Sequence, residues 1–284
     1  MNAMISGMHS PITAAFRLLA FLVLTLLVLP PYAALLACGQ VGWCRRIACR
    51  YWRLVVAALG FKVVVRGNMV ERRPALFVAN HISYLDIVVL GSLLPAAFVA
   101  KKEVAQWPGF GFIAKLGRTV FVDRRPRKSL HQRDEMIGRL GADGESLILF
   151  PEGTSSDGNR VLAFKSALLS VAEVVLEDGR HLPVQPVSLA YTRLDGMPMG
   201  RPWRPFFAWY GGMELVPHLW TALGLGRPTI EVDFHPPVSL EQFASRKALA
   251  DHCHDVIRHA VILANLGRVP APAAGAATAA VAAG

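Results

Sequence analysis

A histidine and an aspartate five residues apart are the side chains in this sequence best suited to chemistry. His81 and Asp86 lie in segment 80–86, which directly follows the apolar run 75–79. That run predicts a buried β-strand and residues 87–90 predict a helix, so His81 is expected at a strand-to-helix corner. A carboxylate at this spacing can accept a hydrogen bond from Nδ1–H, which leaves Nε2 free to take a proton from an attacking hydroxyl. The pair therefore predicts a general base with its orienting partner.

The same residues also suit a structural role. Ser83 and Asp86 have the spacing of a capping box, and an acidic side chain in the first turn of a helix is stabilised by the helix dipole without any catalysis. Residues 80–86 alone leave both interpretations open, so the choice depends on residues further along the chain.

Two other predicted strands end at residues that could bind a ligand. Strand 119–123 runs into residues 124–128, where four of the five side chains are basic; this pattern fits either a phosphate site or a solvated charged segment. Strand 146–150 ends at residues 151–154, where Glu152 enters a loop and Gly153 permits an unusual backbone conformation.

Strands and helices are predicted to alternate along most of the chain. The predicted strands cover 62–67, 75–79, 96–100, 119–123, 146–150, 182–189 and 230–234, and later helices are predicted over 129–140, 159–173 and 239–263. This alternation predicts an α/β fold, with a mixed, mostly parallel sheet flanked by helices and ligands bound at the carboxyl ends of the strands.

The amino-terminal segment is predicted to meet lipid. Residues 18–36 contain no charged side chain, and as a helix they would extend roughly 28 Å, close to the hydrocarbon thickness of a bilayer. Because Pro30 and Pro31 interrupt the run, the sequence predicts either one spanning helix or two shorter helices lying in one leaflet. Only Arg17 precedes the run, whereas four arginines follow it between residues 45 and 53. This bias places the remainder of the protein on the cytoplasmic side of the inner membrane.

The composition of the chain also favours lipid as a partner. The chain has 284 residues, of which 53% are hydrophobic, and a net charge of +10. Basic proteins seek nucleic acid, anionic lipid or acidic protein; the apolar amino terminus makes lipid the first choice, and no nucleic-acid motif stands out. The four cysteines lack paired spacing, and segment 251–254 (Asp-His-Cys-His) falls in a helical pattern where adjacent side chains point apart. No disulfide framework, metal or cofactor is therefore predicted.

Four separated segments, in order, resemble the lysophospholipid acyltransferase family, which includes the bacterial 1-acylglycerol-3-phosphate acyltransferases. The first motif, His-x4-Asp, matches His81 and Asp86 with the preceding Asn80; the second is similar to residues 117–124, although Gly117 lies one residue further from the phenylalanine than in many members. The third closely matches residues 150–154 and the fourth resembles residues 184–187. The resemblance covers residues 61–262, a full domain in size.

The resemblance implies direct acyl transfer from a thioester, on acyl carrier protein or coenzyme A, to the hydroxyl of a lysolipid. His81 and Asp86 would be catalytic, Arg124 would contact the acceptor's phosphate, and Glu152 with Gly153 would shape the acceptor pocket. Lys101 or backbone N–H groups could stabilise the oxyanion. The predicted substrate-binding residues are Arg124, Glu152, Gly153, Thr154, Phe121, Lys101 and Pro186. The expected organisation is a membrane-associated segment 1–60, a catalytic domain 61–263 and a disordered Ala/Pro/Gly tail 264–284.

One departure bears on the acceptor. Many phosphatidate-forming members of the family carry arginine directly after the Glu-Gly-Thr segment, where this chain has Ser155. Losing a charge-assisted phosphate contact removes about 1.5 to 3 kcal/mol. The first expectation is 1-acyl-sn-glycerol-3-phosphate, giving phosphatidate, because this is the commonest activity of the family. The alternative is the acceptor of the lyso-ornithine lipid acyltransferases, which resemble this chain at the same motifs.

Two functions of other classes remain open at this point. A membrane-bound thioester hydrolase would use the same base to activate water, but Arg124 and Glu152 would then have no role. A noncatalytic membrane adaptor would use only the basic surface, which leaves the pairing of His81 with Asp86 unexplained.

Overall fold

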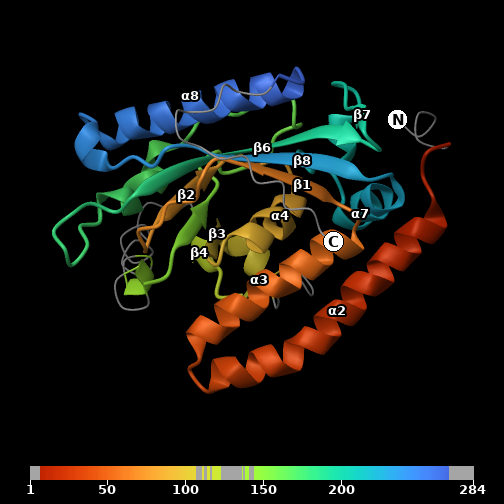
Figure 1. Cartoon of the computed structure of the whole chain (residues 1–284), viewed down its shortest axis with the longest axis horizontal. Coiled ribbons are helices and arrows are strands. Elements are labelled where there is room, and N and C mark those ends of the chain that lie inside the picture. The colour runs from red at the N-terminus through yellow and green to blue at the C-terminus, as the bar shows by residue number, and fades with distance from the viewer. Residues whose placement is uncertain are drawn as a thin grey trace.

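An eight-stranded sheet forms the centre of the protein (Figure 1). The computed structural model describes residues 7–106, 111, 114–115, 117–122, 136, 138–140 and 144–268. The strands are β1 (Lys62–Arg66), β2 (Leu76–Ala79), β3 (Ala97–Lys101), β4 (Val120–Val122), β5 (Leu147–Leu149), β6 (Val184–Leu194), β7 (Met197–Pro198) and β8 (Pro228–Phe234). Their order is β1-β8-β6-β2-β5-β3-β4, with β7 paired to β6.

The sheet is mixed and mostly parallel, which confirms the predicted fold class. Strands β6, β2, β5, β3 and β4 run parallel to one another, and β8 pairs antiparallel with β6 and parallel with β1. The central strands β2 and β5 are buried along their whole length. They are continuous apolar runs, as expected of strands covered by helices on both faces.

Two hydrophobic cores lie on opposite faces of the sheet (Figure 1). One core lies beneath α2 (Pro11–Ala37), α3 (Val41–Ala58), α4 (Leu85–Leu93) and α7 (Leu215–Gly224). The other lies beneath α8 (Arg246–Asn265) and the 3-10 helix η3 (Ser166–Glu173). Three short 3-10 helices complete the described elements: η1 (Lys102–Gln106), η4 (Arg204–Phe206) and η5 (Leu240–Gln242).

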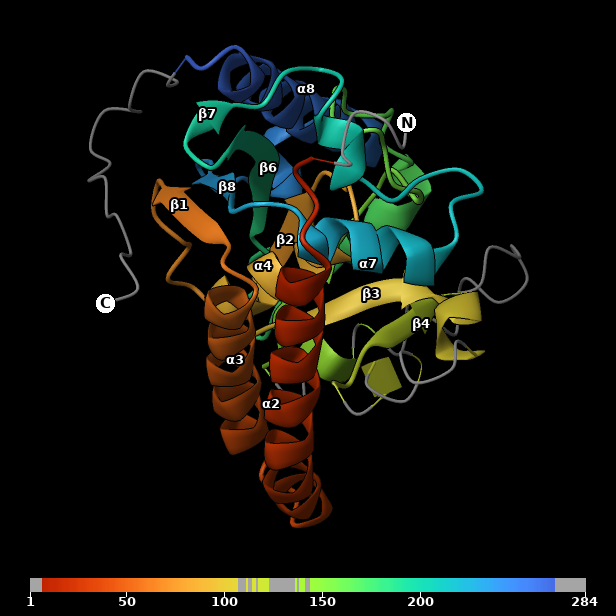
Figure 2. The same ribbon diagram turned by 90° about the vertical axis from the view of Figure 1, so that its right-hand side faces the viewer.

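The amino-terminal segment is a helical hairpin that projects from the domain (Figure 2). Helix α2 runs unbroken through Pro30 and Pro31, and the chain reverses only after Ala37. The two prolines therefore did not break the helix. A proline costs an intrahelical hydrogen bond, but α2 packs along α3, and the hydroxyls of Thr25 and Tyr51 join the two helices at 2.8 Å.

The hairpin is fixed to the domain through α7. Arg17 donates hydrogen bonds to the carbonyl oxygens of Leu223 (2.9 Å) and Leu225 (2.6 Å), at the end of α7. The backbone N–H of Ser10 donates to the carbonyl of Gly224 at 2.9 Å. A cation is stabilised where a helix leaves carbonyl groups unpaired at its carboxyl end. The amino-terminal turns of α2 are therefore held in one orientation relative to the sheet.

Two predicted helices differ from the structure. Residues 159–165 are not helical, and only η3 forms within the predicted span 159–173. The reason is that the backbone N–H groups of Leu162 and Lys165 donate to Glu152 and Pro151, so an α-helix loses these donors. Residues 239–263 are divided: the capping box of Ser239 begins the short η5, and α8 begins separately. Most of the helix predicted over 129–140 lies outside the described residues.

The close approach between the end of β1 and β8 can be tested by substitution of a glycine. Gly67 has a φ of +75°, and a Cβ placed there would lie 2.0 Å from the carbonyl oxygen of Phe234 in β8. Gly196 has a φ of +84° with nothing within 4 Å, and is a matched control. We expect Gly67→Ala to lower the free energy of unfolding by about 3 kcal/mol or more, and Gly196→Ala by about 1 kcal/mol. Denaturant unfolding of the purified proteins, followed by circular dichroism, measures both; equal losses would contradict the proposed clash.

Candidate active site

The corner that carries His81 is held against the neighbouring strand by a buried amide. Asn80 follows β2 directly; its Nδ2 donates to the carbonyl oxygen of Leu189 at 2.9 Å, and its Oδ1 accepts from the N–H of Leu189 at 2.8 Å. Leu189 lies in the middle of β6. The paired hydrogen bonds satisfy a side chain that is buried and fix where the chain leaves the sheet.

His81 and Asp86 form the predicted pair. His81 Nδ1 lies 2.9 Å from Asp86 Oδ2. The same carboxylate oxygen accepts hydrogen bonds from the backbone N–H groups of Ile82 (2.7 Å) and Ser83 (2.9 Å). The Asp86 side chain is fully buried, whereas that of His81 is 21% exposed. The carboxylate thus holds the backbone turn that precedes α4 and orients the imidazole at once, although α4 itself has no side-chain cap at its first turn.

Tyr191 is a further partner that the sequence did not predict. This side chain is buried in β6, and its hydroxyl donates to Asp86 Oδ1 at 3.2 Å. Its ring stacks on Phe207 at 5.8 Å between centroids. Burial, with the nearby Asp86 carboxylate, raises the pKa of Tyr191, so the hydroxyl keeps its proton and remains a donor. A tyrosine in an apolar strand is typical of a core, and no sequence signal marked it.

Glu152 is a buried side chain that accepts hydrogen bonds from the backbone of two separate segments. Its Oε1 accepts from the N–H of His81 and its Oε2 from the N–H of Leu162, each at 2.8 Å. Burial raises the pKa of Glu152 to about 8, against the two N–H donors, which lower it. The carboxyl group therefore ties the loop after β5 to the backbone of His81. A role in shaping the acceptor pocket stays a prediction.

The imidazole of His81 is enclosed by the segments that follow β5 and η4. Its ring stacks on Phe150 with 4.2 Å between centroids and 20° between planes. The carbonyl of His81 accepts from the N–H of Ser156 at 2.9 Å, and that of Ile82 accepts from the N–H of Trp209 at 3.0 Å. Because Asp86 occupies Nδ1, Nε2 is the ring nitrogen that remains for a substrate.

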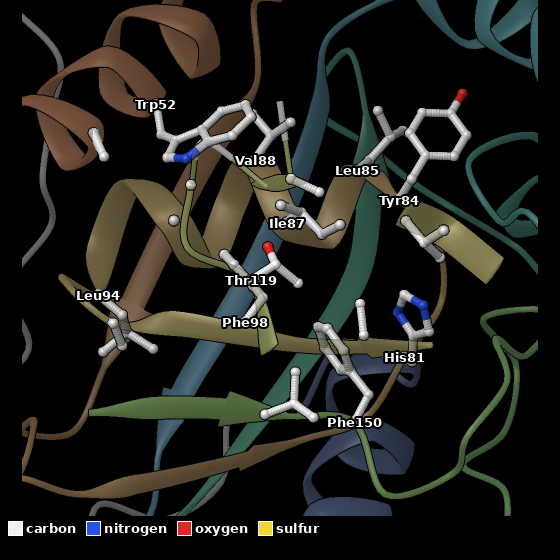
Figure 3. Close-up of a pocket in the computed structure, with 18 of the residues that line it drawn as sticks. Trp52, His81, Tyr84, Leu85, Ile87, Val88, Leu94, Phe98, Thr119 and Phe150 are labelled. Carbon is white, nitrogen blue, oxygen red and sulfur yellow. The ribbon is translucent and has the colours of Figure 1, made fainter. Parts of the chain in front are cut away.

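A largely apolar cavity of about 430 Å³ opens beside His81. Figure 3 shows His81 and Phe150 on one side of the residues drawn, and Trp52 and Leu94 on the other. The wall is built mainly from α3, α4 and β3, with contributions from α2 and the carboxyl half of α7. Representative lining residues are Phe21, Trp52, Val88, Leu94, Phe98 and Leu219.

Only some of the predicted substrate-binding residues line the cavity, and Glu152, which bonds to the backbone of His81 and Leu162, is not among them. Lys101, Gly153 and Thr154 line the same cavity as His81. Phe121 lies on β4 and Pro186 on β6, where Pro186 pairs in register with Val78; neither lines the cavity.

Arg124 lies outside the described residues. Among the residues that the structure describes, no group of three or more His, Cys, Asp and Glu side chains could hold a metal ion.

The acyltransferase family model matches residues 62–190. A lyso-ornithine lipid O-acyltransferase from Brucella abortus is 43% identical over 256 residues, 89% of this chain and 96% of that protein. The chain belongs to this acyltransferase family. A 1-acyl-sn-glycerol-3-phosphate acyltransferase from Neisseria meningitidis is 31% identical, over 74% of this chain and 78% of that protein. The protein is therefore an acyltransferase of lysolipids.

The fold is also similar to a solved structure. The crystal structure of the 1-acyl-sn-glycerophosphate (LPA) acyltransferase PlsC from Thermotoga maritima aligns with a TM-score of 0.56 and 24% identity, over 86% of this chain and 96% of that one. This likeness supports the architecture, the mixed sheet with flanking helices.

The hydrogen bond from Tyr191 gives a first test of the acyltransferase site. Removing a donor from a buried charged acceptor costs about 1.5 to 3 kcal/mol, so we expect Tyr191→Phe to lower kcat about 10- to 100-fold. Tyr51→Phe is the matched control, because this buried tyrosine bonds to Thr25 in the helical hairpin, away from Asp86. Steady-state acyl transfer by both variants is the measurement; similar losses in the two would remove Tyr191 from the site.

Glu152 gives a test by pH. Its pKa is about 8 in the folded protein against an ordinary 4.5, so between these values the folded state binds more protons than the unfolded state. Stability contributed by Glu152 is therefore complete below pH 4.5 and is lost as the pH rises towards 8, by about 1 kcal/mol per pH unit. Glu152→Gln cannot titrate.

We expect the stability of wild type minus that of Glu152→Gln to fall steadily from pH 5 to pH 8 in denaturant unfolding. Taking this difference cancels the other titrating groups, including the buried His218 and His235. A difference that is constant across the range would show that Glu152 is ionised throughout.

Proposed function

We propose that this protein is a lyso-ornithine lipid O-acyltransferase. The observation that carries the proposal is the similarity to the Brucella abortus enzyme of that name, which extends over nearly the whole of that protein. It exceeds the similarity to the Neisseria 1-acyl-sn-glycerol-3-phosphate acyltransferase in both identity and coverage. Lysophosphatidate, the acceptor first expected from the sequence, becomes the second candidate, supported by the Neisseria relative.

The position after the Glu-Gly-Thr segment supports this order. Ser155 lines the cavity, and its hydroxyl donates to the carbonyl oxygen of Trp209. The side chain thus bonds within the protein and brings no positive charge to the site. An acceptor with two phosphate charges gains less here than at a site with arginine in this position.

The proposed reaction is direct acyl transfer. Nε2 of His81 takes the proton of the acceptor hydroxyl as its oxygen attacks the thioester carbonyl, and Asp86 stabilises the imidazolium that forms. The tetrahedral intermediate collapses, the carbon–sulfur bond breaks, and the thiolate of the carrier takes the proton back from His81. Lys101, which lines the cavity, is proposed to stabilise the oxyanion. The donor is acyl carrier protein or acyl-CoA.

The cavity is proposed to hold the acyl chain. Its wall is largely apolar, and burying hydrocarbon there is favoured by about 25 cal/mol per Å². Trp52 and Leu94 line it on the side away from His81 (Figure 3). Gly91 makes room for this arrangement, because a Cβ at that position would lie 2.6 Å from Cδ1 of Trp52.

The helical hairpin is proposed to lie in one leaflet of the membrane. Helix α2 is long and apolar enough to span a bilayer, yet both of its ends contact one domain: Arg17 bonds to the end of α7, and Tyr32 lines the cavity. A spanning helix would separate these ends by the bilayer. Its outward residues are apolar, namely Ile12, Phe16, Leu19, Val23 and Leu26. Exposed arginines on α3, Arg46 and Arg50, favour anionic lipid on the cytoplasmic side.

An acyl-transfer assay tests the proposed function. The purified, detergent-solubilised protein is given labelled acyl carrier protein or acyl-CoA, with lyso-ornithine lipid and lysophosphatidate offered separately. We expect acylated product with lyso-ornithine lipid at a kcat/KM at least tenfold above that with lysophosphatidate. His81→Ala should lower both by 10² or more, because it removes the base.

Three other results would each revise the proposal. Preference for lysophosphatidate would make the second candidate correct and show that Ser155 does not exclude a phosphate. Free fatty acid released without use of either acceptor would indicate a thioester hydrolase. Full activity in His81→Ala would remove the proposed base.

A further inference from the structure

Helix α7 presents an uncharged, apolar face to the outside of the protein. The ten residues Leu215–Gly224 contain no Asp, Glu, Lys or Arg. Val216 is 75% exposed and Trp220 39% exposed, and Pro217 between them is also exposed. The opposite face is buried and includes His218 and Leu223. A short surface helix in water usually turns charged residues outwards, so this outer face needs an explanation other than solvent.

The apolar face of α7 continues that of α2. The rings of His9 and Trp220 lie 6.4 Å apart, and His9 Nε2 is 3.2 Å from the carbonyl oxygen of Trp220. Ser10 and Arg17 both bond to the end of α7. The exposed Ile12 and Phe16 of α2 fall between these two attachments in the sequence, and Figure 2 shows one end of α7 beside the first turns of α2. The two sets of exposed side chains therefore belong to one surface region.

We propose that α7 is a third membrane-contacting element, in which Val216 and Trp220 insert into the leaflet that holds the hairpin. This inference rests on the proposed membrane contact of α2. The occupant is lipid, because the face adjoins the apolar stripe of α2, the chain carries a net charge of +10, and tryptophan favours the boundary between headgroups and hydrocarbon. The exposed arginines of α3 supply attraction to anionic headgroups.

The inner face of α7 gives this contact a consequence for the reaction. Leu219 and Leu223 line the cavity beside His81. His218, which burial keeps neutral by lowering its pKa, is hydrogen-bonded through Nδ1 to the hydroxyl of Tyr84 at 2.9 Å, and Tyr84 lines the same cavity. One short helix therefore has lipid on its outer face and the substrate cavity on its inner face. The lysolipid acceptor would pass from the bilayer to His81 along this edge.

The test compares two double variants of the full chain. Val216→Ser with Trp220→Ser removes the apolar face of α7 without touching a residue that lines the cavity. Val175→Ser with Met197→Ser is the matched control, because these residues are 54% and 72% exposed and lie outside α2, α3 and α7. Binding is measured by flotation with vesicles of phosphatidylcholine and phosphatidylglycerol. Activity is measured with lysolipid acceptor in the same vesicles and dispersed in detergent.

We expect the α7 variant to bind vesicles about tenfold more weakly than wild type and to lose activity on vesicle-borne acceptor in proportion. Its activity in detergent, and both properties of the control variant, should stay within about twofold of wild type. Unchanged vesicle binding by the α7 variant would overturn the inference and leave the acyltransferase proposal intact. Wild-type protein that transfers acyl groups in detergent but does not float with vesicles would overturn the proposed membrane contacts of α2 and α7. It would leave the acyltransferase proposal intact. A wild-type dimer that the α7 variant converts to a monomer, with equal vesicle binding, would assign this face to a second copy.

Discussion

The buried charge of Asp86 is the constraint on which the site depends. A carboxylate removed from water costs several kcal/mol unless donors replace the water. Here the donors come from the His81 ring, the N–H groups of Ile82 and Ser83, and the hydroxyl of Tyr191. They belong to the corner after β2 and to β6. The neutralisation of one charge therefore requires the corner and the neighbouring strand to meet in one register, and the imidazole is positioned as a result.

Glu152 extends the same logic to a second segment. It links the backbone of His81 to that of Leu162, so the loop after β5 and the irregular chain before η3 are held against the corner. Two acidic motif residues thus each bond to two backbone N–H groups: Asp86 to those of Ile82 and Ser83, and Glu152 to those of His81 and Leu162. The separation of the motifs in the sequence reflects the strands that must meet, since β2 pairs with both β5 and β6. A residue of a family motif can therefore be needed to assemble the site, as well as to contact the substrate.

The sequence predicted the elements whose signals are local. The apolar runs of β2 and β5 and the spacing of His81 and Asp86 located the sheet and the corner correctly. Tyr191 escaped prediction because its partner Asp86 lies 105 residues away in the sequence, and an apolar strand gives no sign that one hydroxyl has a charged acceptor. The first part of the helix predicted over 159–173 did not form for a related reason, because the loop after β5 takes the backbone donors of residues 162 and 165. Helix α2 is continuous despite its two prolines because it packs on α3. In each case a tertiary contact overrode the local pattern.

The two hairpin helices differ in pattern because they have different neighbours. Helix α3 carries exposed arginines on one side and packs on α4 with the other, so it is amphipathic. Helix α2 is apolar around its circumference: Leu18 and Phe21 line the cavity, while Phe16 and Leu19 face outwards. If the outer side meets lipid and the inner side meets an acyl chain, hydrocarbon lies on both sides and no polar face is required. The absence of a polar face on α2 is then a consequence of acyl transfer at a membrane surface, and the helix separates the bulk lipid from the single chain held for reaction.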